Sequence, residues 1–122
     1  MKVRRITEKV SPEEVASIVA EEFGEMAKVD VDIEKKILVV GGEWHSEGQD
    51  ELVSKGSDGS VVWGCNFYPF READKRIEYN SLINIKPAIG HTSMDIEDED
   101  VKKQMRDVIE TLLLSPNETV QR

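Results

Sequence analysis

A chain of 122 residues with 39% hydrophobic residues can build one core but hardly two, so we expect a single domain over residues 1–116. Its formal net charge of -9 repels phosphate backbones and anionic lipid, which argues against nucleic acid and membrane surfaces as partners. The single cysteine, Cys65, excludes an intrachain disulfide, and the start of the chain lacks the apolar segment of a signal peptide, so we expect a cytoplasmic protein.

The first predicted elements are a short strand at residues 3–6 and a helix over residues 12–23. Ser11 is a good N-cap, and Pro12 follows at the first helical position, where its missing N–H costs nothing. Apolar residues then recur at helical spacing up to Gly24, which favours the end of a helix.

Two strands are expected next, over residues 28–33 and 37–40, joined as an antiparallel hairpin. Apolar and polar residues alternate in the first strand, which predicts one buried face and one face in contact with solvent. The second strand is apolar throughout and is followed by Gly41 and Gly42, a break in the strand. Beyond this break the pattern indicates only a helical turn near residues 49–53.

The second half of the chain predicts a strand over residues 61–68, a partner strand over residues 76–86, and an amphipathic helix over residues 98–113. Residues 117–122 are expected to form a frayed tail. The predicted fold class is therefore α+β, a mainly antiparallel sheet of about four or five strands with two helices packed on one face.

The sequence Gly-Gly-Glu-Trp-His after the apolar strand contains the first candidate site. If Glu43 and His45 lie in extended chain, their side chains point the same way, and a carboxylate and an imidazole converge. Such a pair can bind a ligand or serve as acid and base. The alternative is a turn in which both side chains are solvated.

Three further polar residues lie inside apolar strand patterns, where amides and amines need partners or line a wet cleft. They are Asn66, Asn84 and Lys86. Asn84 interrupts an apolar run and shares a strand face with Lys86, so the two could present an amide and an ammonium to an anionic ligand. The alternative is the ordinary solvent face of a half-exposed sheet.

Metal and cofactor sites are not predicted. His91 is the only histidine besides His45, and no motif links the two residues. Cys65 lies among apolar strand residues, where a thiol behaves as a small buried hydrophobe. We therefore expect no bound metal and no cofactor.

Four segments carry a resemblance to a known family. They are Gly42-Glu43-Trp44-His45, Trp63-Gly64-Cys65-Asn66, Ser81-Leu82-Ile83-Asn84-Ile85-Lys86-Pro87 and Ser93-Met94-Asp95-Ile96. Together they resemble a family of small, functionally unassigned prokaryotic proteins from archaea and cyanobacteria. The resemblance implies a free-standing domain and no particular reaction.

The leading functional hypothesis is a binding or interaction module for a small ligand or a protein, with its site at the strand end formed by the polar residues above. One alternative is a small hydrolase-like enzyme that uses Glu43 and His45, with an amide as oxyanion donor. The other is a purely structural homodimer or adaptor that pairs through a sheet edge.

Overall fold

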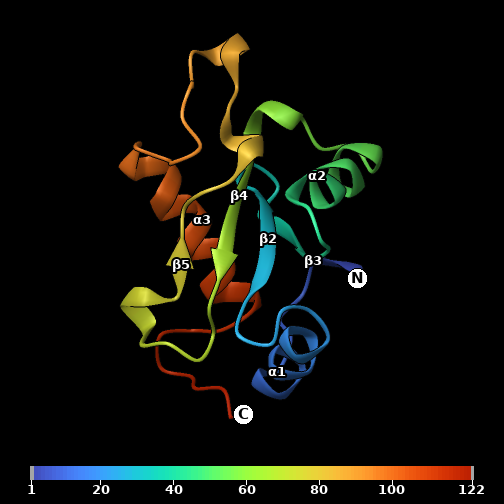
Figure 1. Cartoon of the computed structure of the whole chain (residues 1–122), viewed down its shortest axis with the longest axis vertical. Helices are drawn as coiled ribbons and strands as arrows, with labels where there is room; N and C mark the ends of the chain where they lie inside the picture. Colours follow the sequence, from blue (N-terminus) through green and yellow to red (C-terminus); the bar gives the residue numbers. More distant parts are fainter. Residues whose placement is uncertain (1, 122) are drawn as a thin grey trace.

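The computed structural model describes residues 2–121 and contains a five-stranded antiparallel sheet with three α-helices (Figure 1). The strands are β1 (Val3–Ile6), β2 (Ala27–Asp32), β3 (Ile37–Gly41), β4 (Val62–Phe67) and β5 (Ile77–Glu78), in the spatial order β1-β3-β2-β4-β5. The helices are α1 (Pro12–Glu21), α2 (His45–Ser54) and α3 (Glu99–Leu112). The predicted α+β class is confirmed.

The main core lies between the sheet and the two helices α1 and α3. Alternate residues of β2 and β4 face it, among them Val29, Val31 and Trp63, as the period-two pattern predicted. Both helices contribute their apolar stripes to the same cluster, so the prediction that they share one side of the sheet is confirmed.

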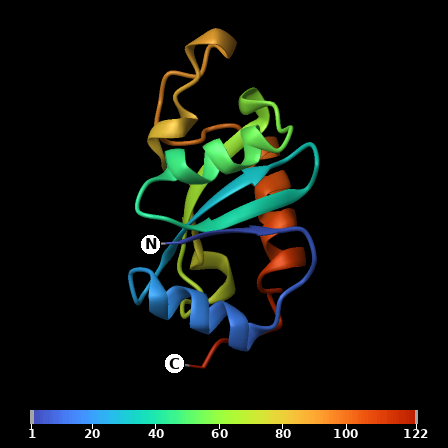
Figure 2. The same cartoon turned by 90° about the vertical axis from the view of Figure 1, so that its right-hand side faces the viewer.

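The opposite side of the sheet is covered by α2, which the sequence had indicated only as a turn (Figure 2). Its apolar contact is small, because the buried hydrophobic cluster there consists, among the residues that the structure describes, of Val39, Leu52 and Val62. The expected solvent face of β2 is therefore wrong at Asp30 and Asp32, which are completely or almost completely buried. The fold has three layers: α2, the sheet, and the pair α1 and α3.

Helix α1 begins at its expected cap, Ser11, and α3 begins after Asp98. The Ser11 hydroxyl accepts a hydrogen bond from the Glu14 backbone N–H, and Asp98 does the same for the first turn of α3. Helix α1 ends before Gly24, whose N–H reaches back to the Val19 carbonyl.

The strand predicted over residues 76–86 is wrong after Glu78. The chain leaves the sheet there because Ser81 caps a short 3-10 helix, Leu82–Asn84, through its hydroxyl. A second short 3-10 helix, Pro87–Ile89, lies at the tip of a loop that projects from the body of the protein in both views (Figures 1 and 2). The alternation of isoleucines at 83 and 85 does not come from a strand.

Residues 117–121, expected to belong to a frayed tail, make contacts with the domain. The buried Arg76 side chain donates hydrogen bonds to the carbonyls of Ser115 and Glu118, at 3.1 and 2.8 Å. The Glu118 carboxylate pairs with Lys9 at 2.7 Å, and Val120 packs against the main core. Arg76 thus connects the segment after α3 to the edge of the sheet.

None of the helices within residues 2–121 has the length and apolar character needed to cross a membrane.

Candidate functional site

The path from β3 into α2 is set by Gly41 and Gly42. Both have positive φ, at 104° and 96°, a conformation that side-chain-bearing residues rarely adopt. Gly41 also lies so close to the Lys2 carbonyl that a Cβ atom would overlap it. These glycines turn the chain out of the sheet and across its surface, so that α2 begins at His45.

Because the helix begins at His45, the expected convergence of Glu43 and His45 does not occur. Glu43 is exposed, whereas His45 is buried against the sheet. The carboxylate that serves this turn belongs to Glu47, which accepts hydrogen bonds from the backbone N–H groups of Glu43 and Trp44, at 3.0 and 2.9 Å.

The acidic partner of His45 is Asp30, at the centre of β2. His45 Nδ1 lies 2.8 Å from Asp30 Oδ1, and both side chains are buried between α2 and the sheet. Gly48, one turn further along α2, lies directly against the Asp30 carboxyl group, and a Cβ atom there would overlap Oδ2. A glycine inside the helix thus allows α2 to approach the sheet closely enough for the pair to form.

The environment of Asp30 favours its neutral form. Burial raises its pKa from 3.8 to about 6, and the hydrogen bond and charge of His45, with the charges of Lys28 and Lys86, offset only part of this effect. Asp30 Oδ2 is buried and has no hydrogen-bond partner. Asp30 and His45 therefore form a buried pair that can share one proton.

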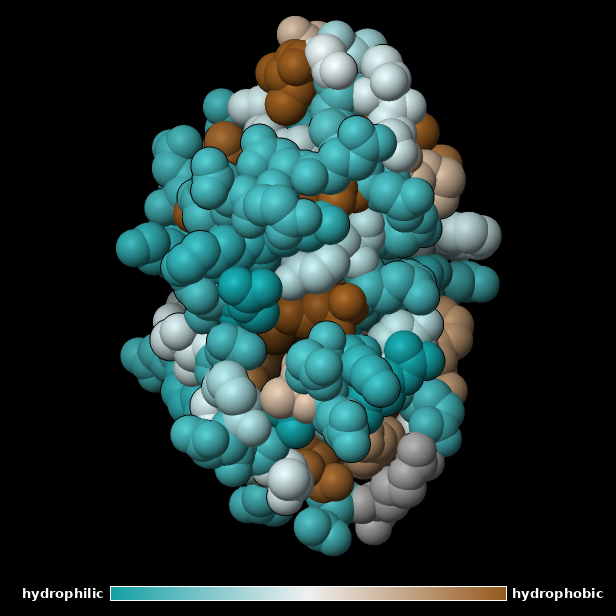
Figure 3. All heavy atoms as spheres, turned by 90° about the vertical axis from the view of Figure 1, so that its left-hand side faces the viewer, coloured by the Kyte–Doolittle hydropathy of each residue, from teal (hydrophilic) through white to brown (hydrophobic). Residues whose placement is uncertain are grey.

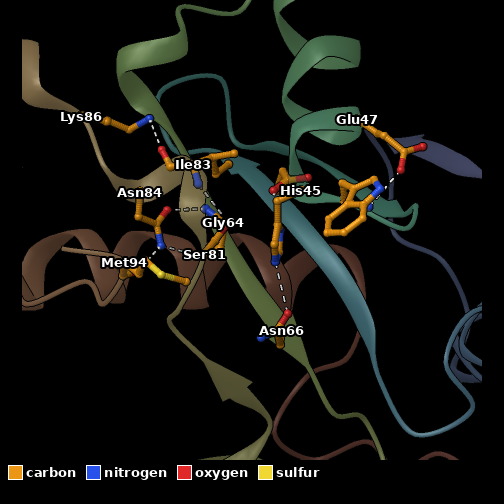
Figure 4. A network of polar contacts seen from close by, with 11 residues as sticks. His45, Glu47, Gly64, Asn66, Ser81, Ile83, Asn84, Lys86 and Met94 are labelled. Atoms are coloured by element: carbon orange, nitrogen blue, oxygen red, sulfur yellow. Dashed lines mark hydrogen bonds and ion pairs between the residues drawn. The ribbon is translucent and has the colours of Figure 1, made fainter. Parts of the chain in front are cut away.

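The other side of the imidazole ring contacts β4. His45 Nε2 lies 3.2 Å from Asn66 Oδ1, and Asn66 Nδ2 donates to Glu78 Oε1 on β5 at 2.9 Å. Figure 4 shows the ring reaching from the start of α2 to Asn66. His45 and Asn66 are the two predicted site residues that the structure brings into direct contact.

Asn84 is fully buried, and its amide makes the hydrogen bonds to β4 that the backbone of a neighbouring strand would otherwise make. Its Oδ1 accepts from the Gly64 N–H at 2.8 Å, and its Nδ2 donates to the Gly64 and Met94 carbonyls, both at 3.0 Å (Figure 4). The amide continues the hydrogen bonding of β4 beyond the point where β5 leaves the sheet. These contacts make Asn84 a structural residue.

Lys86 is also buried, and its ammonium has hydrogen-bond partners within the protein. Its ammonium donates to the carbonyls of Gly59 and Ile83, at 2.9 and 3.1 Å, and lies 5.0 Å from the centre of the Trp63 ring. Burial lowers the pKa of Lys86, and the nearby charges of Asp30 and Asp58 oppose this effect. Lys86 connects the projecting loop to the β4 side of the sheet.

A pocket of about 240 Å³ lies beside His45, between the start of α2 and the segment that follows β5. Its lining consists of Lys28, Trp44, His45, Ser46, Leu82, Ile83 and Met94. Trp44 and Leu82 are 61% and 67% exposed, unusually high values for large apolar side chains. The pocket thus combines apolar walls with one cationic side chain and the edge of the buried His45 pair.

Two larger hollows border α3 on the other side of the sheet. One, of about 380 Å³, is lined by residues that include Ile77, Tyr79, Arg106 and Glu110, and the other measures about 350 Å³. Figure 3 shows a mainly hydrophilic face of the protein with an apolar strip in a hollow across its middle. Neither hollow contains a histidine or a buried carboxylate.

Within residues 2–121, no three histidine, cysteine, aspartate or glutamate side chains are arranged to hold a metal ion. His91 hydrogen-bonds through Nδ1 to the Asn84 carbonyl at 2.6 Å and packs edge-on against Trp63. Cys65 is buried in the main core, where burial raises the pKa of its thiol well above the ordinary value. This thiol is not a candidate nucleophile.

Asp30, Lys28 and the apolar walls of the pocket were not predicted from the sequence. The overlooked signal is the spacing of His45, Gly48 and Leu52, which fall on one face of a helix at intervals of three and four residues. Only Leu52 is apolar, so the pattern did not indicate a buried face.

The family model described as "Protein of unknown function (DUF5674)" matches residues 4–112. No curated protein and no solved structure matches the chain. The matched range includes β2 to β5, all of β1 except its first residue, the three α-helices and the whole of the pocket beside His45.

Proposed function

The chain belongs to the DUF5674 family of proteins of unknown function, and we propose that it binds a small organic anion with an apolar body in the pocket beside His45. The observation that carries this proposal is the charge of the lining. Lys28 and His45 contribute to the pocket, and no acidic residue does, although the chain has a formal net charge of -9. A local excess of cationic and hydrogen-bond-donating groups attracts an anion.

The apolar part of the ligand is indicated by the walls. Trp44, Leu82 and Met94 are all more than a third exposed, and all three line the pocket. A small ring between them would cover part of this surface, and Trp44 offers a flat face for stacking. The volume of about 240 Å³ is below the range typical for drug-sized ligands, so the ligand is a single ring or a short chain.

A binding role is favoured over hydrolysis by the hydrogen bonds around His45. Its two nitrogens already contact Asp30 and Asn66, so neither is free to activate a water molecule as a general base. Asn66 or Asn84 was expected to donate to an oxyanion, but the amide of Asn84 donates instead to the carbonyls of Gly64 and Met94, and that of Asn66 donates to Glu78. An adaptor role through a sheet edge has no comparable support from the pocket.

The test uses benzoate, with benzamide as a neutral ligand of the same shape, added to the ¹⁵N-labelled protein. We expect benzoate to shift the amide signals of Trp44, His45 and Ser46 and the Trp44 indole signal, and benzamide to bind more weakly. A Lys28→Met variant should lose several-fold in benzoate affinity, because the ammonium of this half-buried lysine contributes on the order of 1 kcal/mol.

A Lys103→Met variant is the matched control, because Lys103 is an exposed lysine on α3, where it pairs with Asp107. Its benzoate affinity should equal that of the wild type. The proposal fails if millimolar benzoate leaves the signals around Trp44 unchanged, or if the two lysine variants lose affinity equally.

A further inference from the structure

The larger of the two hollows beside α3 has a volume of about 380 Å³, and we call it the Tyr79 hollow. The short 3-10 helix Ala73–Lys75, strand β5 and helix α3 all contribute to its lining. Ile77, Tyr79 and Pro116 supply most of its apolar surface. Figure 3 shows this side of the protein, with an apolar strip in a hollow between hydrophilic surfaces. No residue lines both this hollow and the pocket beside His45, so the two are separate.

Three charged side chains line the Tyr79 hollow, and they carry both signs. They are Asp74 from the 3-10 helix and Arg106 and Glu110 from α3. In the part of the chain that the structure describes, none of the three belongs to an ion pair. By contrast, Lys102 and Lys103 on the same helix pair with Glu99 and Asp107. The charges that border the hollow are therefore available to a ligand.

Arg106 and Glu110 are each positioned by a neighbour rather than by one another. Burial raises the pKa of the Tyr79 hydroxyl, and the charge of Arg106 opposes this effect. Burial lowers the pKa of the Arg76 guanidinium, and the charge of Glu110 opposes that effect. Arg106 thus lies near the Tyr79 hydroxyl, and Glu110 lies near the buried Arg76.

The polar atoms of these side chains have capacity left for a ligand. A guanidinium has five N–H donors, so the interaction of Arg106 with the Tyr79 hydroxyl leaves several donors for a carboxylate. Between residues 2 and 121, no hydrogen bond of another group ends on the carboxylate of Asp74 or Glu110. Both carboxylates can therefore accept from an ammonium group.

The spacing of the charges indicates the kind of ligand. Arg106 and Glu110 are four residues apart on α3, so their Cβ atoms are about 5–6 Å apart. An α-amino acid carries its carboxylate and its ammonium on one carbon atom, and it can contact both side chains at once. A simple anion in the same place would be repelled by Glu110 and Asp74, and a simple cation would be repelled by Arg106.

We propose that the Tyr79 hollow is a second binding site, which takes a free α-amino acid with an apolar side chain. Arg106 binds the carboxylate, Glu110 and Asp74 accept from the ammonium, and Ile77 and Tyr79 contact the side chain. The volume of about 380 Å³ lies at the lower end of the range for small-molecule sites, which suits one small molecule. This inference does not depend on the proposed function of the pocket beside His45.

The first arm of the test compares three related ligands that differ in charge. They are L-leucine, protonated L-leucinamide, which is a cation, and N-acetyl-L-leucine, which is an anion. Each is added to the ¹⁵N-labelled protein. We expect leucine at millimolar concentration to shift the amide signals of Ala73, Ile77 and Tyr79 and to leave the Trp44 indole signal unchanged. The two analogues with a single charge should bind more weakly.

Three results of this arm overturn the proposal. One is that millimolar leucine leaves the signals of Ala73, Ile77 and Tyr79 unchanged. Another is that leucinamide or N-acetyl-leucine binds as tightly as leucine, because the hollow would then recognise one charge only. The third is that the shifts occur around Trp44, which would assign the ligand to the pocket beside His45.

The second arm removes one charge at a time. Arg106→Met should weaken leucine and N-acetyl-leucine by about two- to fivefold, the effect of one partly exposed ion pair, and should not weaken leucinamide. Glu110→Gln should weaken leucine and leucinamide and should not weaken N-acetyl-leucine. Because Glu110 also acts on Arg76, Asp74→Asn is the independent variant, and it should follow the pattern of Glu110→Gln.

Arg5→Met and Glu8→Gln are the matched controls, because both residues are exposed and neither lines the Tyr79 hollow. Their affinities for the three ligands should equal those of the wild type. A general loss of structure would weaken all three ligands together, whereas the proposal requires opposite patterns for Arg106→Met and Glu110→Gln. Equal losses for all three ligands, or equal losses in the controls, overturn the proposal.

Discussion

His45 shows how far a single residue can be interpreted from sequence. Its polar character and its position after two glycines made it a candidate, but its partner, Asp30, lies fifteen residues away on another element. Glu43, the neighbour that the sequence suggested, is exposed. The pairing depends on where α2 lies on the sheet, and no local pattern contains that information.

The role of Asn84 also depends on contacts that the sequence does not show. A buried amide in an apolar run does need partners, as expected, but the partners are the backbone groups of Gly64 and Met94. The sequence alone cannot distinguish an amide that binds a ligand from one that completes a sheet.

Gly48→Ala provides a test at the scale of one methyl group. Alanine favours a helix over glycine by about 1 kcal/mol, but its Cβ would overlap Asp30 Oδ2 and approach Val39. We expect the overlap to prevail and the free energy of unfolding to fall by about 1–3 kcal/mol in urea denaturation.

Gly59→Ala is the matched control, because a Cβ there meets only Gln49 and Val53 at ordinary contact distances of 3.5 and 3.8 Å. Its stability should stay within about 0.5 kcal/mol of the wild type. Equal effects of the two substitutions would show that α2 does not lie close to Asp30 in solution.

At the scale of elements, the helices and strands that were predicted correctly are those whose signals, a cap or an apolar periodicity, are local in the sequence. The cap at Ser11, the apolar spacing in α3 and the alternation in β2 and β4 were sufficient to place these elements and their apolar faces. Helix α2 was missed because its buried face carries a histidine and a glycine besides Leu52.

Helix α2 therefore depends more on polar contacts than α1 or α3 do. Three buried hydrophobic residues form the cluster beneath it, and two aspartates of β2 lie on the same side of the sheet. Asp30 contacts His45, and Asp32 accepts a hydrogen bond from the Ser57 hydroxyl, just after the helix, at 2.6 Å. The protonation of Asp30 should accordingly affect the stability of this layer.

The pKa of Asp30, raised from 3.8 to about 6 mainly by burial, gives the sign of that effect. The folded protein holds this proton more tightly than the unfolded chain, so the stabilising contribution is fully present below pH 4 and is lost as the pH rises through 6. We expect the free energy of unfolding of the wild type, relative to Asp30→Asn, to fall by up to about 3 kcal/mol across this window.

Urea denaturation of both proteins at intervals from pH 4 to pH 8 measures the difference, and it cancels the titration of the other carboxylates. Parallel curves for the two proteins would contradict a raised pKa at Asp30. A difference that grows with pH would indicate that the charge of His45 outweighs the burial.

At the scale of the whole molecule, the two sides of the sheet differ in the kind of contacts that cover them. The core between the sheet and the pair α1 and α3 is apolar and extensive, whereas the α2 side combines a small apolar cluster with the buried polar pair and the pocket. The sequence predicted the first side almost completely. It could not predict the second, because the contacts there join residues of β2, β4 and α2 through side-chain hydrogen bonds.

The contacts of the segment after α3 extend the folded domain beyond the residues that match the family, and a deletion can test their contribution to stability. The match ends at residue 112, yet Arg76 donates to the carbonyls of Ser115 and Glu118, and Val120 packs on the main core. Deletion of residues 117–122 removes one of these acceptors from a buried guanidinium. We expect the free energy of unfolding to fall by about 1–3 kcal/mol, the cost of an unsatisfied buried group.

Glu118→Ala separates the backbone contribution from the side-chain contribution. This variant loses the ion pair with Lys9 and the contact with the Ser115 N–H but keeps the Glu118 carbonyl on Arg76. Because a partly exposed ion pair contributes at most about 1 kcal/mol, the substitution should cost less than the deletion in the same urea denaturation. If the deletion costs nothing, Arg76 finds other acceptors and the tail is frayed in solution, as the sequence alone had suggested. If the two changes cost the same, the Glu118 carboxylate rather than the backbone carbonyl attaches the tail to the domain.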